Sequence, residues 1–177
     1  MNTAASPTSK IPIPTSLGVF VVSYSPKGLS SLRFPDPQAT LEVEPNAAAC
    51  PDPEWHRLTT TALQSLLAGS APVELPPFDI SPGTEFQQRV WKALLEIPFG
   101  QTKTYSEIAK QIGNPEAVRA VGGACGANRI PVLIPCHRVL AAGHRIGGFS
   151  GGLDWKRVLL KLEGITAFDS SDQPLLL

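Results

Sequence analysis

The segment from Pro72 to Pro82 most constrains how this chain can fold, because four of its eleven residues are proline. Proline fixes φ and has no backbone N–H, so such a segment can be neither a helix nor a central strand. We interpret it as a linker or an edge segment and place a domain boundary there. The 177 residues suffice for one domain of ordinary size or two small ones.

Before this boundary, the pattern predicts a flexible start and then a small unit of strands and one helix. Alternating apolar residues predict two strands joined as a hairpin, and apolar residues at helical spacing predict the helix. The flexible start is expected over residues 1–15. The two strands are expected over residues 17–24 and 28–34. A loop over residues 35–53 would then lead to the helix over residues 55–67.

After the boundary, the chain is predicted to be mainly helical. Thr84 is a candidate N-cap for a helix over residues 85–96. A second helix is expected over residues 105–112. A third is expected to begin with Asn114 as N-cap and Pro115 at its first position. Two short helices joined by a tight turn form a helix-turn-helix pattern, which on its own is only moderately specific.

Charge is divided unevenly between the two parts, although the whole chain has 15 basic and 15 acidic residues. Residues 1–79 hold four Lys or Arg against seven Asp or Glu, whereas residues 80–168 hold eleven against six. A basic C-terminal part beside an acidic N-terminal part is expected when one part contacts phosphate. An ordinary scatter of surface charge is the alternative.

The cysteine pattern argues against a disulfide framework and against a metal site. The three cysteines, Cys50, Cys125 and Cys136, form no CxxC pair and no Cys/His cluster of the zinc-binding kind. The start of the chain has no apolar run typical of a signal peptide or a membrane span. We therefore expect a cytoplasmic protein that uses no metal and no organic cofactor, and in which a reactive thiol stays reduced.

Residues 134–139 contain the strongest chemical signal, because they place Cys136 directly between Pro135 and His137. A thiol is nucleophilic as its thiolate, and a nearby imidazole or positive charge lowers its pKa. Pro135 favours a rigid turn that orients the cysteine. Taken alone, a buried inert cysteine beside a surface histidine explains this pair equally well.

Other motifs around the Cys-His pair remove that ambiguity. In chain order, the motifs are Ile97–Tyr105, Arg119–Ala124, Asn128, Ile134–Val139, Gly148–Gly152 and Leu162–Gly164. This ordered set resembles the O6-alkylguanine-DNA alkyltransferases over residues 83–164. Residues 1–80 contain no recognised motif and resemble the first domain of that family only in size and in strand-then-helix order.

The resemblance implies an α+β protein with two functional parts. Residues 16–80 would form a small α/β support domain, ribonuclease H-like. Residues 81–168 would form a winged-helix-like domain that binds DNA and accepts the alkyl group, and residues 169–177 would be a tail. The implied function is direct-reversal repair: the protein binds duplex DNA through the minor groove, flips out O6-alkylguanine or O4-alkylthymine, and irreversibly takes the alkyl group. No membrane and no obligate protein partner are expected.

The resemblance also assigns catalytic roles. Cys136 would be the alkyl acceptor, His137 the base that acts through a water, and Glu163 the carboxylate that orients the imidazole, which is the logic of nucleophile, base and orienting acid. Asn128 would hold the turn that carries the Cys-His pair. Tyr105 would donate a proton to the guanine ring as the purine leaves. The alternatives are a solvated Glu163 at a helix end and a Tyr105 that only packs.

Further residues would contact the extruded base and the DNA. Ser150 would donate to O6, while the carbonyls of Cys136 and Val139 would accept from the exocyclic amine. Arg119 would fill the gap left by the flipped nucleotide, and small neighbours would let its helix approach a narrow minor groove. Those neighbours include Ala117, Val118 and Gly122. Tight helix–helix packing is the other reading of the small residues.

Three positions differ from expectation for the family or bear on its pocket. Phe149 stands where the family often has tyrosine, which leaves stacking without a hydroxyl. Cys125 stands where an apolar pocket residue is expected, and Gly151 would leave room at the pocket mouth for alkyl groups larger than methyl.

Three other functions compete with the alkyltransferase. A non-enzymatic alkyltransferase-like lesion binder replaces the cysteine, so Cys136 argues against it. A Cys-His hydrolase leaves Arg119 unexplained. A transcription regulator would need polar base-reading residues on the second helix of the pair.

Overall fold

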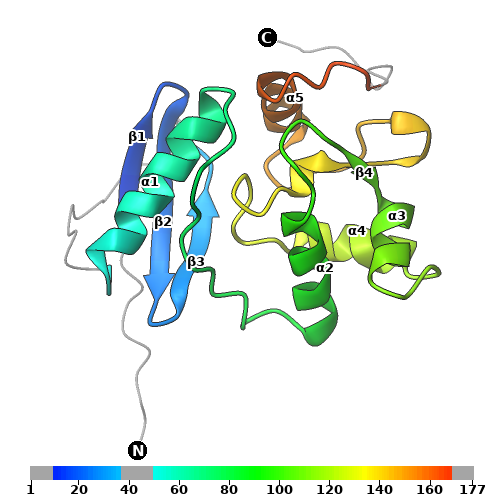
Figure 1. Cartoon of the computed structure of the whole chain (residues 1–177), viewed down its shortest axis with the longest axis horizontal. Helices are drawn as coiled ribbons and strands as arrows, with labels where there is room; N and C mark the ends of the chain where they lie inside the picture. The colour runs from blue at the N-terminus through cyan, green and yellow to red at the C-terminus, as the bar shows by residue number, and fades with distance from the viewer. Residues whose placement is uncertain (1–9, 37–49, 169–177) are drawn as a thin grey trace, which may run out of the picture.

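The structure is a computed structural model that describes residues 10–36 and 50–168 of the chain. It is a mixed α/β fold in which a small sheet covered by one helix lies beside a mainly helical part (Figure 1). Within residues 10–36 and 50–168, no helix is long and apolar enough to cross a membrane. The expected tail at 169–177 lies outside the described residues.

The sheet has three antiparallel strands in the order β1-β2-β3. β2, Gly18–Ser25, and β3, Gly28–Arg33, are joined by a two-residue turn at Pro26 and Lys27, with Ser25 paired to Gly28. The hairpin prediction is therefore confirmed. Gly28 has φ 138°, and a side chain there would collide with the backbone of Pro77.

The prediction of a flexible start is wrong for residues 11–15, which form the edge strand β1, Ile11–Thr15. Ile11 and Ile13 are buried, whereas Pro12 and Pro14 occupy the alternate positions. An edge strand tolerates proline because the missing N–H groups can face away from the neighbouring strand. The alternation of Ile and Pro was the overlooked signal.

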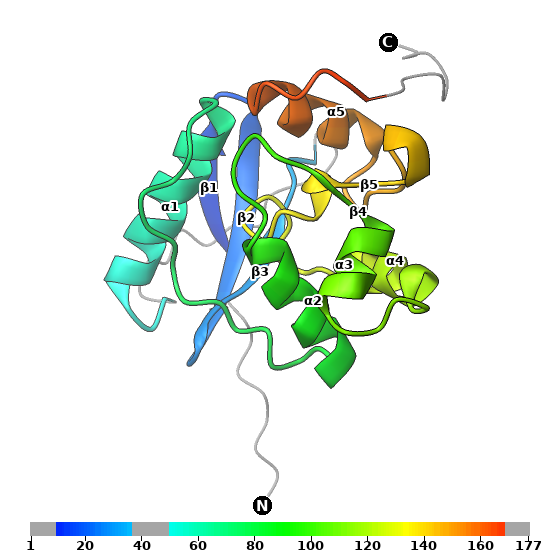
Figure 2. The ribbon, with the colours of Figure 1, turned by 45° about the vertical axis from the view of Figure 1, so that its right-hand side comes forward.

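Helix α1, Pro53–Leu67, covers one face of the sheet (Figures 1 and 2). Its N-cap is Asp52, whose side chain accepts from the Glu54 N–H, and Pro53 occupies the first helical position. The helix ends before Gly69, which has φ 77°. The predicted helix is thus confirmed and begins two residues earlier. Most of the predicted loop, residues 37–49, lies outside the described residues.

The proline-rich segment is both a linker and an edge segment. Phe78 forms a parallel bridge with Leu29 of β3, and the Leu29 N–H donates to Pro77 O while Asp79 N–H donates to Leu29 O, both at 2.8 Å. Asp79 also accepts from the Ser25 hydroxyl at 2.6 Å. The segment is therefore fastened along β3 before the chain enters the helical part.

The helical part contains four α-helices, the 3-10 turns Cys136–Arg138 and Ala142–His144, and a two-stranded parallel ladder. The α-helices and the strands are α2, Glu85–Leu95; α3, Tyr105–Gln111; α4, Val118–Gly126; α5, Leu153–Leu162; β4, Lys103–Thr104; and β5, Val139–Leu140. Thr84 and Thr104 form capping boxes with Gln87 and Glu107, which define the starts of α2 and α3. α5 is not among the predicted helices.

The third predicted helix begins later than expected. Asn114 is not its N-cap: residues 114–117 form a separate turn in which the Ala117 N–H donates to Asn114 O at 3.0 Å. α4 starts at Val118, with Ala117 as N-cap and no side-chain cap. An Asn-Pro pair is typical of turns as well as of helix starts, and here the turn sets the direction of α4.

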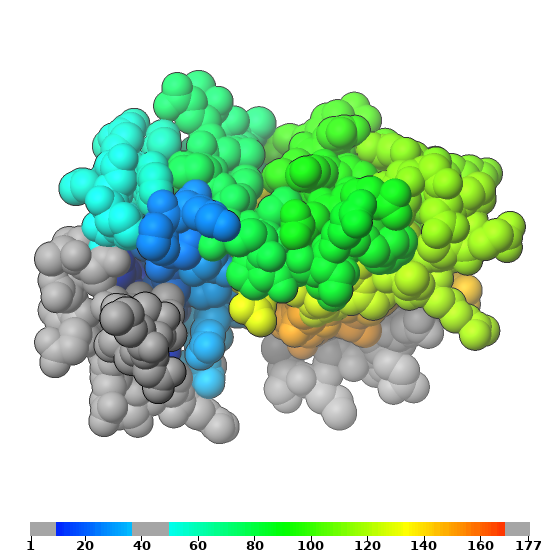
Figure 3. All heavy atoms as spheres, turned by 90° about the horizontal axis from the view of Figure 1, so that it is seen from below, coloured from blue at the N-terminus to red at the C-terminus, as the bar shows by residue number. Residues whose placement is uncertain are grey.

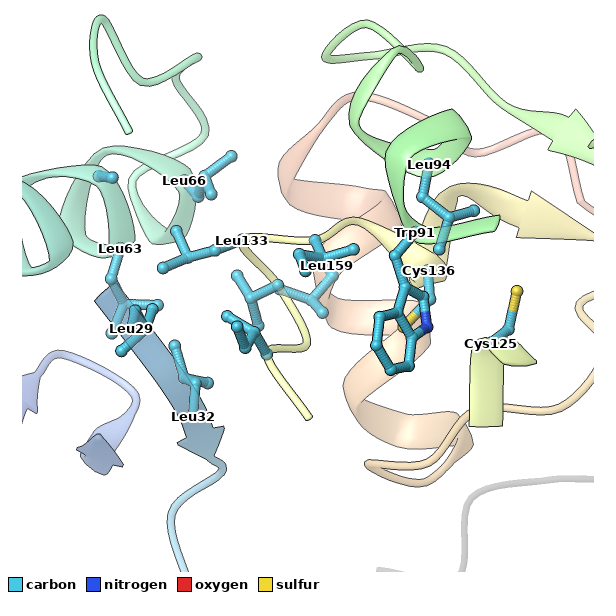
Figure 4. Close-up of a cluster of buried hydrophobic side chains, with 14 of the residues drawn as sticks. Leu29, Leu32, Leu63, Leu66, Trp91, Leu94, Cys125, Leu133, Cys136 and Leu159 are labelled. Carbon is cyan, nitrogen blue, oxygen red and sulfur yellow. The ribbon is translucent and has the colours of Figure 1, made fainter. Parts of the chain in front are cut away.

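One hydrophobic core runs through both parts of the described chain. Figure 4 shows Leu29, Leu32, Leu63 and Leu66 from the sheet side, and Leu133 and Leu159 lying between them and Trp91 and Leu94. The indole N–H of Trp91 donates to Ala124 O at 2.8 Å, so α2 fixes α4. This shared core holds the loop before Cys136 in a fixed place.

Candidate active site

Cys136 begins a single 3-10 turn, Cys136–Arg138, directly before β5. The thiol is 3% exposed and lies at a cavity of about 270 Å³. The cavity is lined by Tyr105, Gly122, Cys125, Gly126, Cys136, Gly148, Phe149 and Ser150. Residues from α3, α4 and the loop before α5 therefore meet around one sulfur atom.

His137, the residue after Cys136, and Glu163 form a buried pair that does not line the cavity. The His137 Nε2 lies 2.7 Å from Glu163 Oε1, and the two side chains are 1% and 3% exposed. Burial lowers the pKa of His137 below its usual range, so the ring is neutral at pH 7. A carboxylate can only accept, so Nε2 carries the proton and Nδ1 keeps its lone pair. Nδ1 has no hydrogen-bond partner among the described residues.

Glu163 follows the last turn of α5 and also binds Arg138. The Arg138 Nε donates to both carboxylate oxygens at 3.1 and 2.9 Å, and its Nη1 donates to Ile97 O at 2.7 Å. Burial alone would raise the pKa of Glu163, but the hydrogen bonds from His137 and Arg138 lower it to about 2. Glu163 is therefore a carboxylate with defined partners and is not a solvated helix end.

Asn128 connects three points of the loop that leads to the cysteine. Its Nδ2 donates to Ile134 O at 2.8 Å and to Cys136 Sγ at 3.2 Å, while its Oδ1 accepts from the Ile130 N–H at 3.0 Å. These contacts span Val132, which is buried with φ 73°, an unusual value for a β-branched residue. Asn128 thus stabilises a strained turn.

Lys156 is a buried cation near the thiol that the sequence analysis missed. Its side chain is fully buried, and its Nζ donates to Val139 O at 2.6 Å and to Gly148 O at 3.2 Å. Burial lowers its pKa to about 8, with the two thiols opposing this effect. A signal existed: Lys156 lies three and four residues before the buried Leu159 and Leu160, on the apolar face of a helix.

The thiol of Cys136 is protonated in the resting site. Complete burial raises its pKa to about 11, against smaller opposite effects of the Asn128 hydrogen bond and the Lys156 charge. A nucleophilic thiolate therefore has to form when a substrate is in place. The residue after Cys136 is the neutral His137, whose Nδ1 has a free lone pair.

The other predicted base contacts line the cavity, apart from Val139 and Gly151. Tyr105, Phe149 and Ser150 line it, and the Tyr105 hydroxyl lies 3.4 Å from Gly148 O. Phe149 meets His137 edge to face, with ring centroids 6.4 Å apart. Val139 is fully buried and does not line the cavity, and its carbonyl already accepts from Lys156.

The structure corrects the expectation for Gly151 and places Cys125 at the cavity. Gly151 does not leave room at the pocket mouth: an added Cβ would collide with the Phe34 ring and lie 2.9 Å from that of Phe149. Cys125 does line the cavity. Burial raises the pKa of Cys125 to about 12, so this second thiol stays protonated and inert near pH 7.

The predicted DNA contacts at the start and on the surface of α4 lie outside the cavity, apart from Gly122. Val118 and Arg119 are exposed and Ala117 is half-buried, while the opposite side of α4 buries Val121 and Ala124. A Cβ added at Gly123 or Gly126 would meet nothing within 4 Å. Helix–helix packing therefore does not explain these two glycines, and the exposed side of α4 is smooth.

No group of three or more potential ligands that could hold a metal ion occurs in residues 10–36 and 50–168. All three cysteines are free.

Known proteins match this chain in sequence and in fold. Residues 85–165 match the family model described as 6-O-methylguanine DNA methyltransferase, DNA binding domain. A methylated-DNA–protein-cysteine methyltransferase of Methanosarcina acetivorans is 42% identical over 151 residues, which cover 84% of this chain and 93% of the relative. One from Mycobacterium tuberculosis is 50% identical over 116 residues, 64% of this chain and 68% of the relative.

A solved structure extends the likeness to the whole fold. The crystal structure of Mycobacterium tuberculosis OGT in complex with DNA superposes with a TM-score of 0.73 at 37% identity, covering 92% of this chain and 96% of that one. These matches define a protein with an O6-methylguanine methyltransferase DNA-binding domain. More specifically, the chain belongs to the methylated-DNA–protein-cysteine methyltransferase family, which confirms the predicted resemblance.

Proposed function

We propose that the protein repairs O6-alkylguanine in duplex DNA by moving the alkyl group onto Cys136. The sulfur attacks the first carbon of the alkyl group, an S–C bond forms, and the bond from that carbon to O6 breaks. The thioether has no route back, so each molecule acts once. The observation that carries this proposal is the buried Cys136 beside a His137–Glu163 pair with a free imidazole nitrogen.

His137 acts as the base in this proposal. Glu163 holds the Nε2–H at 2.7 Å, which leaves Nδ1 to receive the thiol proton through a bridging water. The Asn128 donor at 3.2 Å from the sulfur and the Lys156 charge stabilise the thiolate as it forms. Groups already oriented toward developing charge lower a barrier because they need no reorganisation.

Tyr105 and Ser150 contact the extruded base. Burial raises the pKa of Tyr105 to about 12, so its hydroxyl is a proton donor at pH 7. It donates to the purine ring as the base leaves, while Ser150 donates to O6 as that atom becomes a carbonyl. The carbonyls of Cys136 and Val139 accept from the exocyclic amine; that of Val139 has a second lone pair beside its bond to Lys156.

α4 lies in the minor groove in this proposal. Its exposed small residues permit close approach of the backbone, and Arg119 on its first turn replaces the flipped nucleotide in the base stack. Residues 81–168 then perform binding and transfer as a winged-helix-like unit, and residues 16–80, expected to be ribonuclease H-like, support it. O4-alkylthymine is a second substrate of the same pocket.

A non-enzymatic lesion binder is the alternative, and Cys136 with its buried partners argues against it. The decisive experiment mixes the protein with duplex DNA that contains one O6-methylguanine and maps the protein by mass spectrometry. We expect one methyl group on the Cys136 peptide per molecule and none in Cys136→Ala. Tight lesion binding without methylation, or repeated turnovers, contradicts the proposal.

A further inference from the structure

A groove of about 660 Å³ lies between the sheet and the loop that leads to Cys136. Its lining comes from both parts of the chain: Arg33 and Phe34 at the end of β3, Lys10 just before β1, and Arg129 and Ser150 from the second part. In Figure 3, a space is visible between the light-blue end of β3 and the yellow and orange atoms of residues near 130 and 150.

The lining of this groove is positively charged. Lys10, Arg33 and Arg129 are exposed, and no Asp or Glu is among the lining residues. Within residues 10–36 and 50–168, none of the three has the carboxylate partner that Arg57 has in Glu54. Serine hydroxyls complete the lining, so the groove offers cations and neutral donors together. We call it the cationic groove.

The cationic groove adjoins the cavity at Cys136 and is held in a fixed relation to it. Ser150 lines both. The Leu32 N–H of β3 donates to Arg129 O at 2.8 Å, so the sheet is bonded to the loop that carries Asn128 and Cys136. The Phe34 and Phe149 rings, 5.8 Å apart, fix the other end.

We propose that the cationic groove binds the phosphate backbone of the DNA strand that delivers its base to Cys136. This inference rests on the proposed function. Three cations spread along one groove suit consecutive phosphates better than a single small anion. Since Ser150 contacts the extruded base in the proposed mode, the nearest backbone belongs to the lesion strand and not to its complement.

This assignment differs from the one that net charge suggests. The N-terminal part is acidic overall, and charge alone gives DNA contact to residues 80–168. Lys10 and Arg33 nevertheless belong to the acidic part and lie on the groove beside Arg129. The sheet would thus contribute directly to DNA binding, beyond support of the second part.

The test compares two variants that lose the same charge. The groove variant is Lys10→Gln, Arg33→Gln and Arg129→Gln; the control is Arg57→Gln, Lys92→Gln and Lys161→Gln, whose sites line neither the groove nor the cavity. Affinity for duplex DNA with one O6-methylguanine is measured against salt concentration. Log affinity falls as log salt concentration rises, and each lost phosphate contact makes this slope less steep by about 0.9. We expect the steepness of this slope to decrease by about 2 to 3 in the groove variant and by less than about 1 in the control. Equal decreases in the two variants overturn the proposal.

Reaction with free O6-benzylguanine separates this proposal from the proposed function. Both variants should react with the free base at the wild-type rate, because it brings no phosphate. If the wild-type protein takes no alkyl group from DNA, the proposed function is wrong. If it does take the alkyl group and the two variants show the same salt dependence, only the groove proposal is wrong. Single substitutions at Arg33 and Arg129, each expected to lower the slope by about 1, replace the triple variant if it does not fold.

Neutral phosphate analogues test which strand is bound. Methylphosphonates are placed singly along the lesion strand or its complement, and affinity is compared between the wild-type protein and the groove variant. We expect positions on the lesion strand that weaken the wild type and leave the groove variant unaffected. Such positions only on the complement contradict the proposal.

Discussion

The His137 ring and the Glu163 carboxylate form a buried pair in which Nε2 lies 2.7 Å from Oε1. Arg138 binds the same carboxylate, so one Glu163 serves two basic partners. The pair orients the imidazole, fixes its tautomer, and joins the end of α5 to the turn that carries Cys136. Stability and chemistry therefore depend on the same contacts.

The first prediction concerns acid stability. The pKa of Glu163 is about 2 in the folded protein and about 4.5 in its ordinary state. Because the folded value is depressed, its contribution is complete above pH 4.5 and is lost as pH falls toward 2. The expected loss is about 3 kcal/mol of unfolding free energy. Urea unfolding at pH 5 and pH 2.5 measures about 2 kcal/mol of this loss, because the rest follows only at lower pH.

The variant for this test is Glu163→Gln, which keeps the shape and removes the titration. It should be less stable at pH 7 by about 3 to 5 kcal/mol, because Arg138 stays buried without its counter-charge. Its stability should also fall less between pH 5 and pH 2.5 than that of the wild type. Glu116→Gln, on an exposed turn, is the control and should keep the wild-type curve. A wild-type slope in Glu163→Gln would assign the acid loss to other carboxylates.

The second prediction concerns Lys156 and the pH dependence of transfer. Below pH 8 its ammonium lowers the pKa of Cys136, and above pH 8 it loses its proton. Lys156→Met should react with free O6-benzylguanine about tenfold more slowly at pH 7, if the charge is worth about one pKa unit. The two rates should converge as pH rises through about 8. A constant ratio from pH 6 to pH 10 would show that Lys156 acts through packing alone.

The sequence was sufficient for the parts of the fold that depend on local rules. Thr84 and Thr104 begin their helices because each finds a glutamine or glutamate three residues later. The hairpin follows from the Pro26-Lys27 turn between alternating strands. Where two local rules compete, the sequence did not decide: Asn114-Pro115 is allowed at a helix start and in a turn, and Ile-Pro alternation occurs in loops as well as in edge strands.

Contacts between distant segments were beyond local rules. Phe34 fills the space beside Gly151, although more than a hundred residues separate them. The cationic groove likewise exists only because β3 is bonded to the loop at Arg129. The resemblance implied the roles of Cys136, His137 and Glu163. The protonated state of the Cys136 thiol and the position of Lys156 depend on burial, which cannot be read from the sequence.

The third prediction compares two asparagines, Asn128 and Asn114, for which the sequence analysis expected structural roles. Asn128→Ala removes two donor contacts and one acceptor contact in the buried loop before Cys136. It should cost about 2 to 4 kcal/mol, because backbone groups remain buried without partners. Asn114→Ala should change stability by less than about 0.5 kcal/mol, since α4 has no side-chain cap. Thermal unfolding of the two variants measures both values, and a large loss in Asn114→Ala would restore its capping role.

The last prediction concerns Arg119. Its side chain is exposed on the first turn of α4 and lies outside the cavity that contains Cys136. Arg119→Ala should therefore slow methyl transfer from duplex DNA at least tenfold, because the extruded base leaves a gap that the alanine cannot fill. Reaction with free O6-benzylguanine should stay within about twofold of wild type, since a free base needs no extrusion. Arg57→Ala, on α1, is the control and should change neither rate. If Arg119→Ala slows both substrates equally, Arg119 supports the pocket or the fold, and the intercalation proposal is wrong.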